Sequence, residues 1–403
     1  MANFDLMREL HVKNDGKIVL LIMDGLGGLA SAPDGKTELE AAETPHLDRL
    51  AREGTLGQVV PIARGITPGS GPAHLALFGY DPLFYDVGRG VMEGSGIGMH
   101  IGEGDVAARA NFCTLDDQGN ITDRRAGRIP TEEAIPVVEK LKQIKLPGVK
   151  IDVQLVREYR FAVVMRGPDL DPDIEDTDPQ KTGVPPRKVT AQSPGAEHTA
   201  RLFQQWVEAA CEALKDEPKA NGITLRGFST DPKLPKFPEI YGLNPACIAV
   251  YPMYRGVSKL VGMEILKFEQ ESPEAEFTVA RQHWDDYDFF FIHIKKVDSR
   301  GEDGDFDAKA EVIASVDRAL PALLELEPAV IAVTGDHSTP SQLRSHSWHP
   351  VPFLLWAPGT VRIDAQKVFG ETACAQGGLG TLPTTDIMPL LLAHAKRLRK
   401  YGA

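Results

Sequence analysis

Three short apolar segments, each followed within a few residues by an aspartate, constrain the fold of this chain most strongly. The segments are residues 18–23, 288–294 and 329–334, and the aspartates are Asp24, Asp298 and Asp336. Uninterrupted apolar runs of this length are typical of strands covered on both faces of a parallel sheet. Open α/β sheets gather their ligands at the carboxyl ends of the strands. We therefore predict an α/β fold with a mostly parallel sheet between helices, and a site that contains these aspartates.

Further segments extend this sheet and its helices. Residues 306–326 are amphipathic and join the second apolar segment to the third, which predicts a right-handed crossover through a helix. Residues 351–356 predict one more buried strand. Residues 386–400 predict a closing helix with a basic last turn, which is favourable for the helix dipole.

The middle of the chain differs from the rest in amino-acid composition. Residues 88–104 are rich in glycine, and residues 168–194 are dense in Asp, Pro and Thr, as expected for a hinge and a long surface excursion. We predict a discontinuous core formed by residues 1–93 and 234–403. A smaller α/β domain, residues 94–233, is inserted into it.

Composition excludes several classes of protein. The net charge of −13 over 403 residues argues against a nucleic-acid binder or an anionic-membrane binder, which needs a basic face. The four cysteines are scattered without a CxxC pair, which favours a reduced protein over a structural zinc protein. No apolar stretch has the roughly 18 to 20 residues that cross a bilayer, and the first 17 residues do not resemble a signal peptide. We expect a cytoplasmic location.

The candidate site has the composition of a metal centre. Its predicted ligands are Asp24, Asp298, Asp336, His337 and His346. Taken alone, Asp24 is as readily a turn residue, and His337 is more often a core histidine. The Asp-His pair directly after a buried strand favours the metal site, because both side chains then reach one edge of the sheet. Hard oxygen and imidazole ligands suit two divalent ions about 4 Å apart, an arrangement that points to phosphoryl chemistry.

Ser70 lies in a turn that leads into a short helix, within the sequence TPGSGPAH of residues 67–74. By spacing alone, its commoner role is to cap that helix. Its functional role is that of a nucleophile whose hydroxyl pKa is lowered by a metal, with the helix N-terminus holding the phosphate. His74 receives no role from the sequence.

Eight runs of sequence carry a resemblance to a known family. They are LLIMDGLGG (20–28), TPHLDRLAREG (44–54), GITPGSGPAHLALFGYDP (65–82), EGDVAARANF (103–112), DRRAGRI (123–129), YGLNPACIA (241–249), TGDHSTP (334–340) and HSWHPVPFLLWAPG (346–359). They closely resemble the archaeal-type cofactor-independent (2,3-bisphosphoglycerate-independent) phosphoglycerate mutases of the alkaline phosphatase superfamily. The similarity covers nearly the whole chain.

The resemblance implies an alkaline-phosphatase-like core with two divalent ions (Mn, Mg, Zn or Co) and an inserted domain that closes over the substrate. It assigns Asp24, Ser70, Asp336 and His337 to one ion, and Asp298 and His346 to the other. It implies a metal-dependent isomerase of glycolysis and gluconeogenesis that needs no bisphosphoglycerate. Ser70 would take the phosphoryl group from 3-phosphoglycerate and return it to the other hydroxyl, which gives 2-phosphoglycerate.

The chain departs from the family pattern at one predicted ligand. Glu302 stands where the family usually has a histidine. A carboxylate there favours harder ions, Mg²⁺ or Mn²⁺, over Zn²⁺. His349 is either a compensating ligand or an ordinary surface imidazole.

Cationic and acid–base groups are expected from the inserted domain and its surroundings, because a phosphate and a carboxylate call for guanidinium donors. We predict Asp105 and Arg109 as catalytic residues, and Arg125, Arg128 and Arg255 as substrate-binding residues. For any one of these arginines, a surface ion pair is the commoner role. Lys295 and Lys296 contact the substrate or solvate a loop.

Two alternatives stay open at this point. One is a metal-dependent phosphatase, or another phosphomutase, built on the same core. The other is a metal-binding relative without catalysis, which the change at Glu302 keeps in view. The sequence leaves the metal, the oligomeric state and the balance of mutase over phosphatase activity open.

Overall fold

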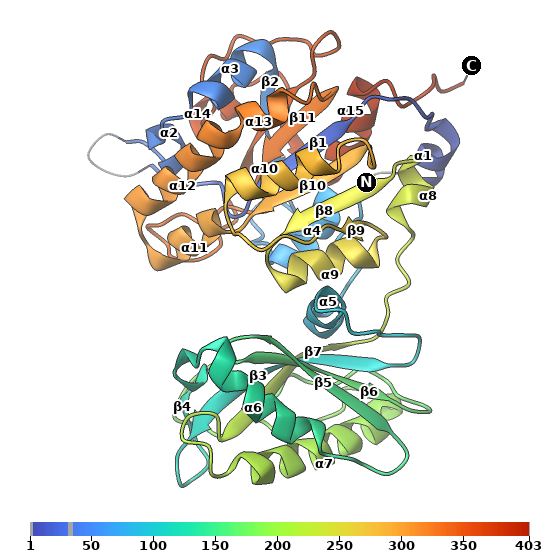
Figure 1. Ribbon diagram of the computed structural model, residues 1–403, viewed down its shortest axis with the longest axis vertical. Helices are drawn as coiled ribbons and strands as arrows, with labels where there is room; N and C mark the ends of the chain where they lie inside the picture. The colour runs from blue at the N-terminus through green and yellow to red at the C-terminus, as the bar shows by residue number, and fades with distance from the viewer. Residues whose placement is uncertain (1–2, 31–34, 403) are drawn as a thin grey trace. The chain divides into compact units, whose positions relative to one another are not determined.

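The structure is a computed structural model that describes residues 3–30 and 35–402 (Figure 1). It divides into two compact units, Met1–Asp86 with Leu234–Ala403, and Val87–Lys233. The second unit begins at Val87 and not at residue 94, because helix α5 (Arg89–Gly96) packs on its strands. Gly90 allows this packing, since a Cβ there would lie 2.4 Å from the carbonyl oxygen of Ala107.

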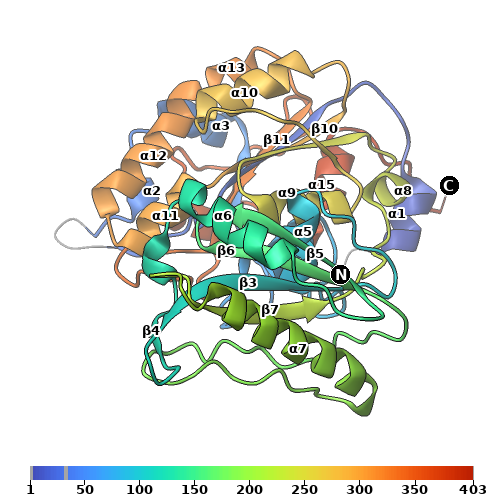
Figure 2. The same ribbon diagram turned by 60° about the horizontal axis from the view of Figure 1, so that its bottom comes forward.

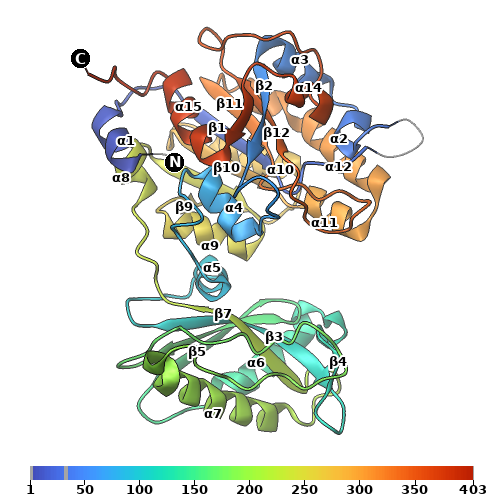
Figure 3. The same ribbon diagram turned by 180° about the vertical axis from the view of Figure 1, so that it is seen from behind.

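An eight-stranded sheet forms the centre of the first unit (Figure 3). In spatial order its strands are β13 (Gly380–Pro383), β2 (Thr55–Val60), β12 (Val351–Trp356), β11 (Val330–Thr334), β1 (Ile18–Met23), β10 (Phe289–Ile294), β8 (Pro245–Ala249) and β9 (Glu264–Ile265). All neighbours pair in parallel, except that β12 is antiparallel to both β11 and β2. The predicted α/β fold with a mostly parallel sheet is confirmed.

Strand β1 lies between β10 and β11 and pairs in parallel with both. Met23 is opposite Ile294, and Ile22 is opposite Thr334, so the three strands end at one level. Every residue of the three strands is buried, which explains their uninterrupted apolar sequences. The connection from β10 to β11 therefore passes over β1.

Helices cover the sheet of the first unit. They are α1 (Phe4–Leu10), α2 (Glu38–Ala41), α3 (Pro45–Glu53), α4 (Ser70–Leu77), α8 (Phe237–Tyr241), α9 (Pro252–Leu260), α10 (Pro273–Gln282), α11 (Lys296–Asp303), α12 (Phe306–Ala319), α13 (Pro321–Leu324), α14 (Glu371–Ala375) and α15 (Ile387–His394). In the described part of the chain, no helix is both long and apolar enough to cross a membrane.

Two predicted helices are shorter than expected. The predicted helix 306–326 is two helices, because Pro321 lacks the N–H that would continue α12 and begins α13 instead. The predicted helix 386–400 ends at His394. Lys396 then adopts a positive φ of 58°, and the chain bridges from Leu398 to His11.

The second unit is an antiparallel sheet with two main helices (Figure 2). Its strands are β3 (Val106–Leu115), β4 (Ile121–Asp123), β5 (Lys150–Arg157), β6 (Arg160–Arg166) and β7 (Gly222–Ser229). Helices α6 (Thr131–Lys142) and α7 (Glu197–Leu214) contact each other and the sheet. The buried side chains of Trp206, Phe161 and Leu141 belong to their common core. This unit is therefore an α/β domain with a core of its own.

Candidate metal centre

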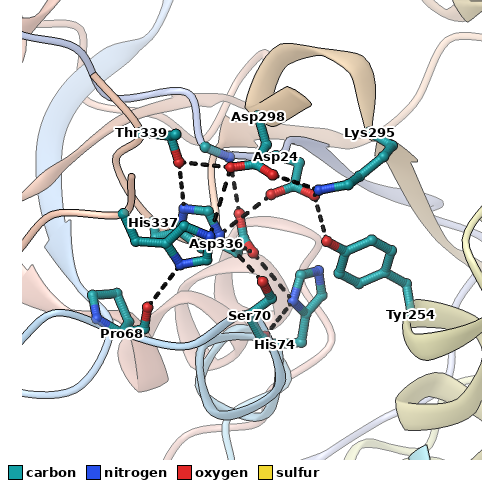
Figure 4. Close-up of polar contacts among 12 residues, drawn as sticks. Asp24, Pro68, Ser70, His74, Tyr254, Lys295, Asp298, Asp336, His337 and Thr339 are labelled. Atoms are coloured by element: carbon teal, nitrogen blue, oxygen red, sulfur yellow. Dashed lines mark hydrogen bonds and ion pairs between the residues drawn. The ribbon is translucent and has the colours of Figure 1, made fainter. Parts of the chain in front are cut away.

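Polar side chains meet at the carboxyl edge of the central sheet in the first unit (Figure 4). Asp24 follows β1, Asp298 lies in α11 after β10, and the pair Asp336-His337 follows β11. Ser70 is the first residue of α4, and His346 lies between β11 and β12. The structure thus brings together the five ligands predicted at the strand ends and the predicted nucleophile.

The ligand atoms form two groups that share one histidine. Atoms of Asp24, Asp336 and His337 lie within 4.8 Å of one another, and so do atoms of Asp298, His337 and His346. His337 Nε2 is 3.4 Å from Asp24 Oδ1 and 3.2 Å from Asp336 Oδ2. The imidazole rings of His337 and His346 stack, with centroids 3.5 Å apart. The division of ligands that the resemblance implies gave His337 to one ion only.

Two buried carboxylate oxygens in this cluster have no hydrogen-bond partner. They are Asp24 Oδ1 and Asp336 Oδ2, the two atoms that face His337 Nε2. The other oxygen of Asp336 accepts a hydrogen bond from the backbone N–H of Gly25. An unpaired buried carboxylate oxygen is costly. A divalent cation would satisfy both oxygens, so the donor set fits such an ion.

Hydrogen bonds fix the tautomers of both histidines. The Thr339 hydroxyl donates to Asp298 Oδ1 at 2.7 Å and therefore accepts from the Nδ1–H of His337 at 3.0 Å. His346 Nδ1–H donates to the carbonyl of Pro68 at 3.0 Å. With this tautomer, Nε2 of His337 accepts from the Ser70 hydroxyl at 3.3 Å and faces Asp24 and Asp336. Nε2 of His346 lies 3.7 Å from Asp298 Oδ1.

The protein shifts the pKa values of the two carboxyls in opposite directions. Burial disfavours the charge of Asp24, but Lys295, His293 and His337 and the hydroxyl of Tyr254 together hold its pKa well below the usual range. Burial and the charges of Asp24 and Asp298 raise the pKa of Asp336 well above its ordinary value. A bound cation would favour the ionised form of both carboxyls, because metal ligands bind in the deprotonated state.

Lys295 supplies the positive charge nearest to the cluster. Its Nζ donates to Asp24 Oδ2 at 2.9 Å and to Asp298 Oδ2 at 2.5 Å. Burial lowers the pKa of Lys295, but Asp24, Tyr254 and Asp298 together outweigh burial and raise it well above its ordinary value. Lys296, in contrast, donates to the carbonyl of Glu271. Of the two lysines that the sequence left open, Lys295 joins the cluster.

Ser70 lies beside the cluster and does not cap the helix. The residue at the N-cap of α4 is Gly69, and no side chain caps it. The Oγ of Ser70 is buried, 3.3 Å from His337 Nε2. His74 Nδ1–H donates to the carbonyl of Ser70 at 2.7 Å. The side chain of Ser70 is thus left for another role than capping.

Glu302 lies one helical turn after Asp298 in α11 but joins neither group of ligand atoms among the described residues. Glu302 is an exposed residue, yet desolvation of its carboxyl and the charge of Asp298 raise its pKa, while Lys295 and His346 act in the opposite direction. It is thus within electrostatic reach of the cluster. His349 Nδ1 bonds to Ser347 Oγ at 3.0 Å, and its ring stacks on Trp348.

Lys309 ties together the two loops that carry the ligands. It is fully buried, and its Nζ donates to the carbonyls of Gly27 at 3.1 Å and Thr339 at 2.8 Å. Gly27 follows Asp24, and Thr339 follows His337. Glu38 lies 3.9 Å from the same Nζ and balances its charge. These two hydrogen bonds fix the distance between the loop after β1 and the loop after β11.

Sequence reasoning gave no role to Tyr254, Thr339 or Lys309. Tyr254 donates to Asp24 Oδ2 at 2.5 Å. Thr339 lies in the run TGDHSTP, two residues after His337, so its proximity was a usable signal. Tyr254 and Lys309 lie on helices far along the chain and carry no local signal for the site.

Two of the four predicted residues of the second unit, Arg109 and Asp105, have side-chain partners within that unit. Arg109 is buried and pairs with Glu93 at 3.2 Å. Asp105 accepts from the N–H of Gly102 at 2.8 Å and pairs with Arg166 at 3.3 Å. The remaining two, Arg125 and Arg128, are exposed in the turn after β4. Their roles toward a substrate stay predictions.

Arg255, the fifth residue of that set, belongs to the first unit. It follows Tyr254 in α9, and its Nε donates to the carbonyl of Ala249 at 2.6 Å. Burial lowers the pKa of this guanidinium. The bond to Ala249 holds Arg255 at the carboxyl end of β8.

The fold and the cluster define a metal-binding α/β protein, and comparisons with known proteins identify its family. Residues 51–220 match the family described as 2,3-bisphosphoglycerate-independent phosphoglycerate mutase. A probable 2,3-bisphosphoglycerate-independent phosphoglycerate mutase of Thermus thermophilus is 50% identical over 100% of both chains. The protein of that name from Thermotoga neapolitana is 51% identical over 98% of each chain.

Two solved structures agree with this result. The PH0037 protein of Pyrococcus horikoshii matches with a TM-score of 0.84 and 31% identity, over 96% of this chain and 99% of its own. The cofactor-independent phosphoglycerate mutase of Thermoplasma acidophilum matches with a TM-score of 0.71 and 31% identity, over 94% and 100%. The chain belongs to the 2,3-bisphosphoglycerate-independent phosphoglycerate mutase family, which is a family of isomerases. Membership implies divalent metal ions, which the donor set fits.

Proposed function

We propose that the protein interconverts 3-phosphoglycerate and 2-phosphoglycerate without bisphosphoglycerate, as a metal-dependent isomerase of glycolysis. One observation carries the proposal. Ser70 Oγ lies 3.3 Å from His337 Nε2, in a cluster where two buried carboxylate oxygens have no partner. A buried alcohol among cation ligands is the arrangement that makes serine a nucleophile toward phosphate. We also expect a cytoplasmic location.

We assign two divalent ions, Mn²⁺ or Mg²⁺, to the cluster. Asp24, Ser70, Asp336 and His337 would hold one ion, and Asp298, Glu302 and His346 would hold the other. His337 Nε2 also lies among the second group of ligand atoms. When bound, the ions lower the pKa of the Ser70 hydroxyl and neutralise charge on the phosphate.

The side chains of the protein perform the transfer in two steps. The Ser70 oxygen attacks phosphorus, the bond from phosphorus to the glycerate O3 breaks, and that oxygen takes up a proton. The glycerate O2 then attacks the phosphorus of the phosphoserine and loses its proton, the bond from phosphorus to Ser70 Oγ breaks, and the serine is regenerated. Asp105 carries the proton between the two hydroxyls, and Lys295 neutralises phosphate charge from its place beside Asp24.

Retention of glycerate between the steps separates a mutase from a phosphatase. Arg109, Arg125, Arg128 and Arg255 would hold its carboxylate through guanidinium hydrogen bonds. The second unit would close over the substrate and exclude water, which otherwise hydrolyses the phosphoserine. The expected substrate is a small phosphorylated acid.

A coupled assay tests the function. Metal-loaded protein with 3-phosphoglycerate and no bisphosphoglycerate should form 2-phosphoglycerate at a rate far above that of phosphate release. Release of inorganic phosphate as the main product would establish the phosphatase alternative. No turnover in the presence of Mn²⁺ or Mg²⁺, with ions bound, would establish a metal-binding protein without this catalysis.

A further inference from the structure

The two oxygens of Asp24 have different surroundings. Oδ2 accepts hydrogen bonds from the Tyr254 hydroxyl at 2.5 Å and from Lys295 Nζ at 2.9 Å. Oδ1 accepts none, although it is buried, and it lies 3.4 Å from His337 Nε2 (Figure 4). The protein thus holds one oxygen of this carboxylate and leaves the other for the cluster.

Packing fixes the hydroxyl of Tyr254 in place. The side chain projects from α9 and is only 1% exposed. Its ring lies 3.8 Å from the ring of His293, at an interplanar angle of 30°, and 4.6 Å from the ring of His74. Aromatic rings packed this closely leave the Tyr254 side chain little freedom to rotate. The hydroxyl therefore reaches Asp24 from a rigid support.

Lys295 does not duplicate this function. Its long side chain divides its donors between Asp24 and Asp298, one from each ligand group. An ammonium group has no preferred direction for its hydrogen bonds, whereas a phenol has one O–H. Tyr254 is thus the donor that sets the rotation of the Asp24 carboxylate.

We propose that Tyr254 is a positioning residue of the metal centre, which orients Asp24 so that Oδ1 faces a divalent cation. This inference deepens the proposed function and rests on it, since it takes Asp24 as a ligand of the catalytic ions. Partners of metal ligands typically change metal affinity 10- to 100-fold when they are removed. Tyr254 should have an effect in this range without contacting the substrate.

The test is the Mn²⁺ affinity of Tyr254→Phe, measured by titration calorimetry on metal-stripped protein. This change keeps the ring between the two histidines and removes only the hydroxyl. We expect the tighter Mn²⁺ affinity to fall 10- to 100-fold. An affinity within twofold of the wild-type value would overturn the proposal.

Tyr241→Phe is the matched control. Tyr241 is also a buried tyrosine of the first unit, and its hydroxyl donates to the carbonyl of Phe78 at 3.0 Å. Its removal should leave the Mn²⁺ affinity unchanged. An equal loss in both variants would show a general effect of losing a buried hydroxyl, and would overturn the proposal.

A double-mutant cycle separates positioning from a structural role. In an Asp24→Asn background, Tyr254→Phe should have no further effect on Mn²⁺ affinity, because its effect acts through Asp24. If Tyr254→Phe lowered the Mn²⁺ affinity as much in the Asp24→Asn background as in the wild type, its effect would not act through Asp24. The cycle stays interpretable even if Tyr254→Phe lowers the thermal stability. Circular dichroism and the melting temperature of each metal-free variant give the fraction of folded protein, and the Mn²⁺ affinity is compared for that fraction.

Wild-type mutase activity distinguishes the two proposals. If the wild type binds Mn²⁺ but forms no 2-phosphoglycerate, and Tyr254→Phe still loses affinity, the proposed function fails and the positioning role stands. If the wild type is active and Tyr254→Phe binds Mn²⁺ normally, the positioning role alone fails. In an active enzyme, excess Mn²⁺ should restore most of the kcat of Tyr254→Phe.

Discussion

Ser70 Oγ lies 3.3 Å from Nε2 of His337, although 267 residues separate them in the sequence. No described carboxylate accepts a hydrogen bond from this hydroxyl. Burial lowers the pKa of His337 well below its ordinary value, so its ring is neutral. A neutral ring whose Nδ1–H is bonded to Thr339 offers Nε2 as a metal ligand. Without a cation this Nε2 accepts the hydrogen bond of the Ser70 hydroxyl, and a cation bound there would use the same lone pair and lower the pKa of the hydroxyl.

Replacement of the nucleophile gives the first prediction. Ser70→Ala should lower mutase activity at least about 1,000-fold, because it removes the hydroxyl that carries the phosphoryl group in the proposed route. The melting temperature should change by no more than about 2 °C, since the change removes one oxygen without opening a large cavity. Ser315→Ala is the control, because that hydroxyl bonds to a carbonyl within α12. Substantial activity in Ser70→Ala would exclude the phosphoserine route.

Glu302 gives a prediction about the second ion. Glu302→Gln should weaken one Mn²⁺ binding step at least about 10-fold and spare the other, because only one ion would lose a charged ligand. Calorimetric stoichiometry and affinity check this. Asp303→Asn, the next residue along α11, is exposed and pairs with Arg300, so it should bind like wild type. Unchanged binding by Glu302→Gln would remove this residue from the ligand set.

Removal of metal should abolish activity and destabilise the fold. Without cations, the partly unpaired carboxylates of Asp24 and Asp336 stay buried together. A free ion concentration of 100 times Kd adds about 2.7 kcal/mol to the free energy of unfolding. That corresponds to a rise in melting temperature of roughly 3–5 °C for a protein of this size. Scanning calorimetry with and without Mn²⁺ checks this, and equal melting temperatures would contradict a centre of this kind.

The pH dependence of stability should reveal a buried carboxyl away from the cluster. Burial, with a contribution from the charge of Glu271, raises the pKa of Glu276 well above its ordinary value. The folded state thus keeps a proton that the unfolded state releases near pH 4.5. The stability that this proton adds is fully present below that pH and is lost as pH rises through the folded pKa.

Melting curves of metal-free protein between pH 5 and pH 9 measure this effect. The melting temperature of the wild type should fall with pH more steeply than that of Glu276→Gln. Glu274→Gln, an exposed position on the same helix, should follow the wild type. Parallel curves for wild type and Glu276→Gln would contradict the prediction.

Burial explains what the sequence could predict. Strands β1 and β12 have the predicted bounds, because strands covered on both faces require uninterrupted apolar residues. The convergence of Asp24, Asp298 and Asp336 followed from the same reasoning, since parallel strands end at one edge. Pro321 is a different case. The amphipathic pattern of residues 306–326 predicts one helix, whereas the missing N–H of proline predicts that the helix is interrupted at Pro321, as observed.

Contacts between distant elements explain what the sequence could not predict. Tyr254 reaches Asp24 because α9 packs against α4 and β8, and Lys309 reaches both ligand loops from inside α12. Neither contact leaves a periodic pattern in the sequence. The roles of the arginines in the second unit could not be predicted either. A guanidinium forms a buried ion pair, such as that of Arg109 with Glu93, as readily as it binds a ligand.

The place of β1 between β10 and β11 has a consequence for biosynthesis. Ile18–Met23 is synthesised well before both of its neighbouring strands, which lie more than 260 residues further along the sequence. At about 5–20 residues per second, the 311 residues from Asp24 to Thr334 take roughly 15–60 s to translate. Until β10 follows it, at residue 294, six consecutive apolar residues have neither neighbouring strand to pair with. The nascent protein is therefore a natural client for chaperones that shield exposed strands.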